Sequence, residues 1–234
     1  MMGVMTRRFL PSGSVRAGGY ASAVRMLVPF LAGSVLPATA FAQRTVAVHD
    51  EPHHRIVLEK GPLRVLDIQI IPGDTTMDHT HSSPILYTYI SLGNGSAGGR
   101  VASNTEYAEV PLTHRVSNAG PSLFRIIALL HNGRGAEGDG DLPVGMKVEP
   151  SVENRWFRSY RLELAPGEVT ETLRHQNDAL IVQVTAGRLE VTKPNGFGAE
   201  LMKEGDWTWR DAGSSYVIRN AGSTPVSVVV NEAR

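Results

Sequence analysis

The sequence predicts an all-β protein that contains two tandem barrels of one small fold. Short runs of β-branched and aliphatic residues alternate with clusters of Gly, Pro, Asn and Asp, a pattern typical of β-sandwiches and barrels. No segment keeps a helical period for more than about two turns. A sequence pattern also recurs after 94 residues, the distance from Gly73 to Gly167, and a repeat of that length is a domain rather than a solenoid unit.

The first 42 residues differ from the rest of the 234-residue chain and are typical of an export signal. They contain four arginines and no acidic residue, followed by an apolar run at 26–36 and the small residues Ala40 and Ala42. These are the three parts of a secretory signal, and the apolar run is shorter than the ~20 residues that span a bilayer. We expect cleavage after Ala42, export by the general or the twin-arginine route, and a periplasmic or secreted mature protein with no membrane contact.

Composition divides the mature chain, from residue 43 onward, into two barrels and a linker. Residues 132–145 contain five glycines in fourteen positions, which is typical of an exposed connection. We therefore expect a first barrel at 43–132, a linker at 133–150 and a second barrel at 151–234. The predicted strands are, in chain order, 57–58, 63–71, 85–92, 123–130, 160–164, 180–184, 189–191 and 226–230.

Matching offsets indicate that the two barrels are copies of each other. A Pro-Gly pair ends at Gly73 and again at Gly167, and a histidine lies eight residues beyond each glycine, at His81 and His175. Both copies also carry an Asn-Ala-Gly segment shortly before their last predicted strand. Such agreement over a whole domain predicts one fold used twice.

Three histidines of the first copy form a candidate metal site. His79 and His81 are two residues apart, so on a strand both imidazoles point to the same face. His114 follows thirty-three residues after His81, just before another apolar strand run. Neutral imidazoles bind Zn, Fe, Ni or Cu, and Mn when oxygen ligands are added. The chain has no cysteine, which excludes disulfides, thiolate metal sites and a cysteine nucleophile.

These residues resemble the two sequence motifs of the cupin superfamily. Gly73, five residues, His79-Thr80-His81 and then Gly93 are similar to the first motif, G-x5-H-x-H-x3,4-E-x6-G. The segment 113–118 is similar to the end of the second motif, P-x-G-x2-H-x3-N. In cupins the histidines and the glutamate hold a metal inside a jelly-roll β-barrel.

The resemblance covers both copies and therefore implies a bicupin, two tandem cupin-type jelly-roll barrels. Carried over residue by residue, it implies a divalent transition metal, Fe, Mn, Zn, Ni or Cu, held by His79, His81 and His114. The glutamate position holds Leu86, or Ile85 at the shorter spacing, which leaves a three-histidine set that resembles the variant in cupin thiol dioxygenases.

Strand alternation predicts how the remaining side chains near the site are directed. Leu86 and Thr88 share a face, so we expect Tyr87 and Tyr89 to point away from the barrel interior. Asp78 and Glu106 are further acid–base candidates, and none of the four is a clear general base. Three histidines fit no motif and are predicted to lie on the surface: His49, His53 and His54.

The second copy has lost most of the ligand positions. The first histidine position is Leu173, the second is His175, the glutamate position is Leu180 and the last histidine position is Tyr216. A single imidazole does not hold a transition metal with useful affinity, so we expect no metal in the second barrel.

Function is left open between three hypotheses. The first is a metal-dependent enzyme of oxygenase, lyase or isomerase type acting on a small molecule, the second is capture of a small ligand without turnover, and the third is a scaffold with a remnant metal site. With 23 basic and 23 acidic residues, the chain lacks the basic excess of a nucleic-acid-binding protein. The sequence leaves open a small-molecule ligand and a homo-oligomer.

Overall fold

Strands are the main regular secondary structure of the described chain, as the sequence predicts. The computed structural model describes residues 44–138 and 140–234, and the predicted export signal at 1–42 lies outside this part. Each of the eight predicted strand segments overlaps a strand. The helices of the described part are two short 3-10 turns, η1 Val48–Asp50 and η2 Glu106–Ala108. Neither of them is long and apolar enough to cross a membrane.

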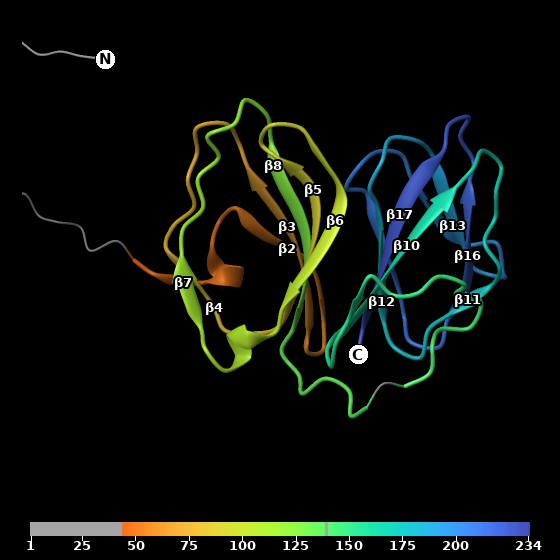
Figure 1. Ribbon diagram of the computed structural model, residues 1–234, viewed down its shortest axis with the longest axis horizontal. Helices are drawn as coiled ribbons and strands as arrows, with labels where there is room; N and C mark the ends of the chain where they lie inside the picture. The colour runs from red at the N-terminus through yellow and green to blue at the C-terminus, as the bar shows by residue number, and fades with distance from the viewer. Residues whose placement is uncertain (1–43, 139) are drawn as a thin grey trace, which may run out of the picture. The chain divides into compact units, whose positions relative to one another are not determined.

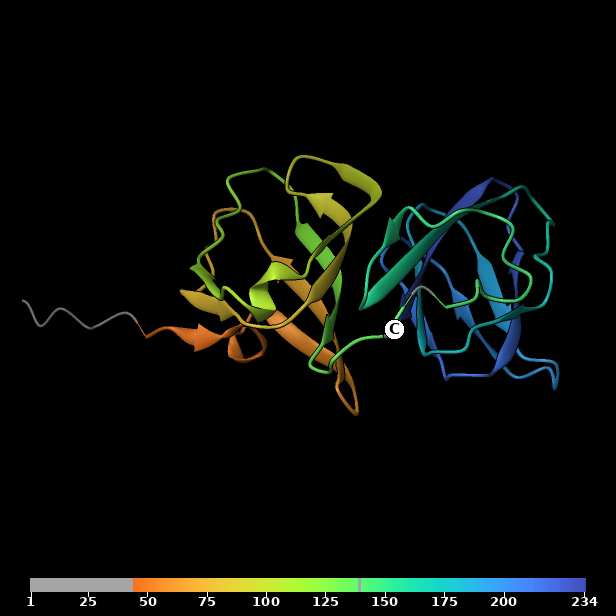
Figure 2. The same ribbon diagram turned by 60° about the horizontal axis from the view of Figure 1, so that its bottom comes forward.

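The first barrel consists of two sheets on opposite sides of an apolar interior. The larger sheet has the order β2-β3-β8-β5-β6 and the smaller one β1-β4-β7. Figure 1 shows β4 and β7 across from β5 and β8, and Figure 2 shows the yellow-green turn η2 in front of the interior. The strands are β1 Val46–Ala47, β2 His54–Lys60, β3 Leu63–Ile70, β4 His79–His81, β5 Ile85–Leu92, β6 Ser96–Asn104, β7 Leu112–His114 and β8 Phe124–His131.

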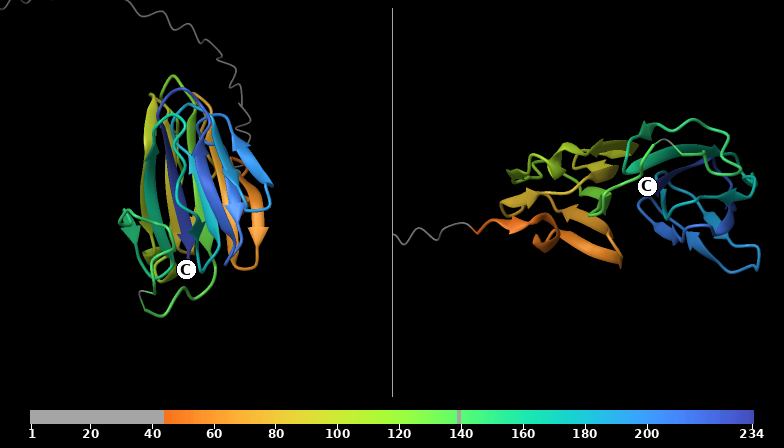
Figure 3. Two further views of the ribbon diagram at one scale, coloured as in Figure 1. Left: turned by 90° about the vertical axis from the view of Figure 1, so that its right-hand side faces the viewer. Right: turned by 90° about the horizontal axis from the view of Figure 1, so that it is seen from below.

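The second barrel, drawn in cyan to blue in Figure 3, repeats this plan. A five-stranded sheet has the order β15-β12-β17-β10-β9 and a four-stranded sheet the order β11-β16-β13-β14. Its strands are β9 Val152–Glu153, β10 Phe157–Leu164, β11 Leu173–Arg174, β12 Ala179–Gln183, β13 Leu189–Thr192, β14 Gly198–Leu201, β15 Trp207–Arg210, β16 Ser215–Asn220 and β17 Val226–Ala233.

One asparagine turn is built in the same way in both barrels. The amide of Asn118 donates two hydrogen bonds of 2.8 Å to backbone carbonyls and accepts one of 3.0 Å from the N–H of Gly120. The amide of Asn220 donates two, of 2.9 and 2.8 Å, and accepts one of 2.9 Å from the N–H of Gly222. The recurring Asn-Ala-Gly segment thus marks a shared local structure, as the sequence repeat predicts.

Strand β5 of the first barrel buries both of its faces. Ile85 and Tyr87 pack in the interior cluster of the first barrel, whereas Leu86 packs in a second apolar cluster with Leu180 of β12 and Val229 of β17. Strands that are buried on both faces have continuous apolar runs instead of an alternating pattern. The second cluster therefore joins the two barrels through the outer faces of their larger sheets.

Candidate metal centre

Strand pairing brings the three predicted histidines to one face of the smaller sheet. β4 and β7 are antiparallel, with His79 directly opposite His114 and Thr80 opposite Thr113. Because alternate residues of a strand share a face, His81 lies on the same side as His79 and His114. The two threonines point the other way, where their Oγ1 atoms are 2.7 Å apart and hydrogen-bonded.

The three imidazoles converge on one point. Their ligand atoms all lie within 4.8 Å of one another, and the Nε2 atoms of His81 and His114 are 3.1 Å apart. Two nitrogens that each lie ~2.1 Å from a common ion are about 3.0 Å apart at a right angle and about 3.4 Å apart at the tetrahedral angle. The observed separation falls within that range, so the pair has the spacing of two ligands of one metal.

A backbone hydrogen bond fixes the tautomer of His79. Its Nδ1 lies 2.9 Å from the carbonyl oxygen of Met77, and because a carbonyl only accepts, Nδ1 carries the proton. Nε2 therefore has a free lone pair, and this atom is buried and has no hydrogen-bond partner in the described chain. Ligating histidines commonly donate their second N–H to a carbonyl in this way. An unpartnered buried acceptor beside two further imidazoles fits a bound transition metal.

Burial keeps the cluster in the form that metals bind. It lowers the pKa of His81 to about 3, with the neighbouring histidines adding to the effect. Burial and the adjacent His79 also lower the pKa of His114. Both rings are therefore neutral at pH 7, as a metal ligand must be.

The histidines line a cavity of about 200 Å³ inside the first barrel. No carboxylate, lysine or arginine is among the described residues that form its wall. The remaining wall residues are aromatic, aliphatic and one further imidazole: His54, Ile68, Ile70, Tyr87, Tyr89, Tyr107, Val116, Phe124 and Ile126. The cavity is therefore suited to a small molecule with a largely apolar body.

The predicted orientation of β5 is wrong, and the structure gives the reason. Tyr87 and Tyr89 line the cavity, while Leu86 faces the cluster that joins the barrels. The residue that occupies the interior glutamate position is Ile85, at the shorter motif spacing. Because both faces of the strand are apolar, hydrophobicity alone does not reveal which face lines the cavity.

The prediction that His54 lies on the surface is also wrong. Its ring is 4% exposed, and its centroid lies 4.5 Å from that of His79. His54 begins β2 opposite Ile68 of β3, and both residues line the cavity. Sequence reasoning missed it because a single histidine at the start of a strand belongs to no motif.

A buried carboxylate holds His54 in place. Glu51 has a fully buried side chain and accepts hydrogen bonds from His54 Nδ1 at 2.5 Å, from His53 Nδ1 at 2.8 Å and from the backbone N–H of Met77 at 3.2 Å. Burial opposes the ionisation of Glu51, but these hydrogen bonds outweigh it and lower its pKa. The only sequence signal for this arrangement is the closeness of an acid to two histidines.

The second barrel shows what the same positions become without a ligand set. Leu173 pairs with Tyr216, as His79 pairs with His114. His175, the counterpart of His81, is hydrogen-bonded through Nε2 to the hydroxyl of Tyr216 at 2.8 Å. These positions therefore hold one imidazole, as the sequence comparison predicts.

The acidic candidates near the site point elsewhere. Asp78 forms a two-pronged ion pair with Arg115, with N–O distances of 2.9 and 3.0 Å, and Glu106 is exposed on η2. Neither lines the cavity.

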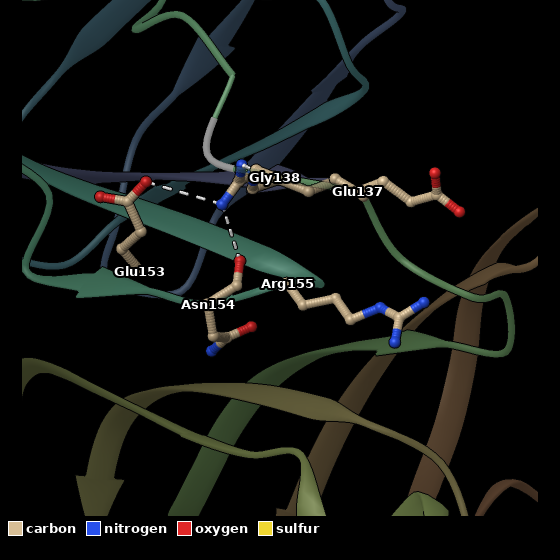
Figure 4. A pocket seen from close by; sticks show the side chains of 7 residues that line it. Glu137, Gly138, Glu153, Asn154 and Arg155 are labelled. Carbon is tan, nitrogen blue, oxygen red and sulfur yellow. Dashed lines mark hydrogen bonds and ion pairs between the residues drawn. The ribbon is translucent and has the colours of Figure 1, made fainter.

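A larger pocket, of about 550 Å³, lies where the glycine-rich linker meets the second barrel. In Figure 4 the side chains of Glu137 and Arg155 extend away from Glu153, and dashed lines mark the contacts of a guanidinium with Glu153 and Asn154. That guanidinium belongs to Arg234, which donates to the carbonyl of Asn154 at 2.9 Å and lies 3.5 Å from a carboxylate oxygen of Glu153. These contacts hold Arg234 against the segment around β9, and a further hydrogen bond of 2.7 Å from Arg234 to the carbonyl of Gly138 reaches the linker. The described residues of this pocket form no set of metal ligands.

Comparison with known proteins supports the fold. No protein-family model matches this chain, and no curated protein matches it. The crystal structure of AerE from Microcystis aeruginosa is similar over 78% of this chain and 93% of its own, with 11% identity and a TM-score of 0.54. A cupin 2 conserved barrel domain protein from Leptotrichia buccalis is similar over 77% of this chain and 88% of its own, with 12% identity and a TM-score of 0.49. A cupin domain from Bordetella pertussis Tohama I is similar over 43% of this chain and 99% of its own, with 24% identity and a TM-score of 0.33.

These likenesses concern the fold alone, because sequence identity is low throughout. Together with the sheets of the two barrels, the similarity to AerE confirms the predicted all-β fold class with two tandem barrels. The structural neighbours of the chain include cupin-domain proteins.

Proposed function

We propose that the protein is a bicupin that holds one divalent transition metal in its first barrel, through His79, His81 and His114, and presents it to a small molecule in the adjoining cavity. The observation that carries the proposal is the convergence of three imidazoles, one of which, His79, has a buried Nε2 without a hydrogen-bond partner in the described chain. Iron, manganese, zinc, nickel and copper all accept nitrogen ligands of this kind.

The chemistry of such a centre follows from its donor set and its walls. Three protein ligands leave coordination positions open, as in catalytic rather than structural sites. A bound metal supplies Lewis acidity or redox chemistry to a small molecule in those positions. The aromatic and aliphatic walls exclude water and orient the apolar part of that molecule. This arrangement serves an oxygenase, a lyase or an isomerase, and the alternative is capture of the ligand without turnover.

Elemental analysis tests the metal centre directly. The mature protein, purified without a histidine tag, should contain about one transition-metal ion per chain, and the double variant His79→Ala, His81→Ala should contain almost none. His175→Gln is the matched control, because it removes a buried imidazole from the equivalent position of the second barrel and should leave the metal content unchanged.

The metal content of the parent protein and of the double variant decides whether the proposed centre holds. A parent protein with far less than one metal per chain, or a double variant that keeps its metal while folded, would contradict the proposed centre. Circular dichroism of each variant separates loss of metal from loss of fold.

We further infer that the protein is exported, from the basic flank, apolar run and small residues of positions 1–42. Mass spectrometry of protein recovered from the periplasm or medium of a bacterial host should give the mass of a chain that begins at Gln43. An uncleaved cytoplasmic product would contradict this inference.

A further inference from the structure

Four histidines face the cavity of the first barrel, and one of them is not needed to hold a metal. The ligand group consists of His79, His81 and His114. The ring of His54 lies 4.5 Å from that of His79 but 6.5 Å from that of His81, centroid to centroid, outside the close group of three. Its place at the cavity wall therefore calls for a role other than metal ligation.

The hydrogen bond with Glu51 assigns the roles of the two ring nitrogens of His54. Glu51 is ionised and accepts only, so Nδ1 of His54 carries the proton and donates it at 2.5 Å. The described residues of the cavity wall include no carboxylate that could accept a second ring N–H, so the other nitrogen, Nε2, keeps its lone pair. Nε2 is then a hydrogen-bond acceptor, and it has no hydrogen-bond partner in the described chain.

The carboxylate that sets this tautomer is itself held on several sides. It accepts hydrogen bonds from the backbone N–H of His53 at 2.8 Å and of Met77 at 3.2 Å, and His53 binds Asp74 with its other ring nitrogen at 3.0 Å. Met77 in turn accepts the hydrogen bond from His79. Glu51 thus positions both the free acceptor of His54 and the strand that carries the metal ligands, before any ligand arrives.

We propose that His54 recognises the small molecule of this cavity, by accepting a hydrogen bond through Nε2 from an uncharged ligand that joins one hydroxyl or N–H group to an apolar or aromatic body. The inference rests on the proposed function for the place of the ligand, in the cavity that His54 lines together with the three ligating imidazoles. It adds to that function the class of molecule that the cavity selects.

The walls and the size of the cavity determine the rest of that class. The wall presents aliphatic and aromatic side chains and no oppositely charged partner for an ionic group, so a charged ligand would lose its hydration without compensation. An apolar cavity of ~150 Å³ accommodates benzene, and this cavity of about 200 Å³ has room for one ring and a substituent.

Phenol and fluorobenzene are suitable probes, because they have similar shape and differ in the hydrogen-bond donor. Binding of each to the metal-loaded mature protein is measured by isothermal titration calorimetry. The variant His54→Asn keeps an N–H near the position of Nδ1 for Glu51 but lacks the acceptor that reaches the cavity. His54→Gln places an amide oxygen near the position of Nε2, and His49→Asn is a control outside the cavity.

The parent and the His49→Asn protein should prefer phenol to fluorobenzene. The preference should fall by about three- to tenfold in His54→Asn, the effect of one hydrogen bond, and it should be partly restored in His54→Gln. Metal content should stay at the parental level in all variants. An unchanged preference in folded His54→Asn, or loss of its metal, would overturn the role assigned to His54.

The metal centre and the recognition role can fail separately. Metal-free parent protein, prepared with a chelator, keeps the Glu51–His54 pair, so the difference in preference between parent and His54→Asn persists there if His54 acts as proposed. If the difference is present but the purified protein holds no metal, the proposed function fails and the recognition role stands. If metal is present but the difference is absent in both forms, the recognition role fails alone.

Discussion

The two residues at the vacant glutamate position, Ile85 and Leu86, allow a matched test of which face of β5 looks toward the metal centre. Each is 1% exposed, so replacing either by glutamate removes a similar amount of buried apolar surface. Their surroundings differ. Ile85 packs in the cluster that includes the cavity residues Tyr87 and Tyr107, whereas Leu86 packs against Leu180 and its neighbours in the second barrel.

The expected cost differs accordingly. Losing the buried side chain costs about 2–3 kcal/mol at either position. At Leu86 the new carboxylate lies in an apolar cluster without a partner, which adds several kcal/mol and brings the total to about 5 kcal/mol or more, comparable with the entire stability of a small domain. At Ile85 the carboxylate faces the side of the three imidazoles and completes a four-ligand set.

Metal dependence distinguishes the two cases. Metal-free Ile85→Glu should be less stable than the parent, but Zn²⁺ should stabilise it more than it stabilises the parent. A tenfold gain in affinity corresponds to about 1.4 kcal/mol, and it appears in full as extra stability when the metal is in excess. Leu86→Glu should gain nothing over the parent from Zn²⁺.

Urea unfolding in chelator and in excess Zn²⁺ measures both effects. Ile85→Gln and Leu86→Gln are the uncharged controls, which separate the loss of packing from the effect of the carboxylate. If Zn²⁺ rescued Leu86→Glu and left Ile85→Glu without extra stabilisation, the assignment of the faces of β5 would be refuted, and with it the place of the cavity relative to the strand.

Three further predictions follow from the same geometry. In metal-free protein, His54 and His81 have folded pKa values of about 4 and about 3, below the unfolded value of ~6.5. The unfolded chain therefore binds more protons, and lowering the pH from 7 to 5 should reduce the free energy of unfolding by about 4 kcal/mol through these two rings. Urea unfolding measures this loss, and a flat profile over that pH range would contradict the burial of both rings in the neutral form. Asn118→Ala removes three hydrogen bonds and should cost about 3 kcal/mol of unfolding free energy; a loss below ~1 kcal/mol in urea unfolding would show that the turn does not depend on them. Leu173→His combined with Tyr216→His recreates a three-histidine set around His175, so elemental analysis should find about two metals per chain, and a folded variant that still holds one would show that the strand pairing alone does not make the site.

Local spacing made the cluster of three histidines predictable from the sequence. His79 and His81 share a face because side chains alternate along a strand with a period of two. His81 also lies as far from Gly73 as His175 lies from Gly167, which placed it within the internal repeat. His114 followed from its position before a strand, and the structure pairs it with His79. The asparagine turn was indicated by the repeat of its Asn-Ala-Gly segment, and two of its three hydrogen bonds connect residues near in the sequence, whereas the third joins Asn118 to the carbonyl of Ile70.

Contacts between distant segments were not predictable in this way. The face of Leu86 is decided by the cluster that joins the barrels, and nothing in a run of apolar residues distinguishes that cluster from the interior of a barrel. The burial of His54 likewise depends on β2 pairing with β3 and on Glu51, whose carboxylate finds its partners only after folding. A sequence motif consists of residues at fixed spacing, and neither the contact of Leu86 with the second barrel nor the contact of His54 with Glu51 belongs to such a motif.

The second barrel provides an internal comparison that bears on function. In the second barrel the positions equivalent to the ligand set hold Leu173 opposite Tyr216, and the Tyr216 hydroxyl is hydrogen-bonded to His175, whose Nδ1 is also buried without a hydrogen-bond partner in the described chain. The same scaffold in the first barrel keeps an unpartnered Nε2 on His79 and an acceptor on His54 that faces a cavity. Both barrels share the turn and the strand plan, so folding does not require these groups. The first barrel differs by its set of three imidazoles beside a cavity, and this is the difference that the proposed binding of a metal and a small molecule requires.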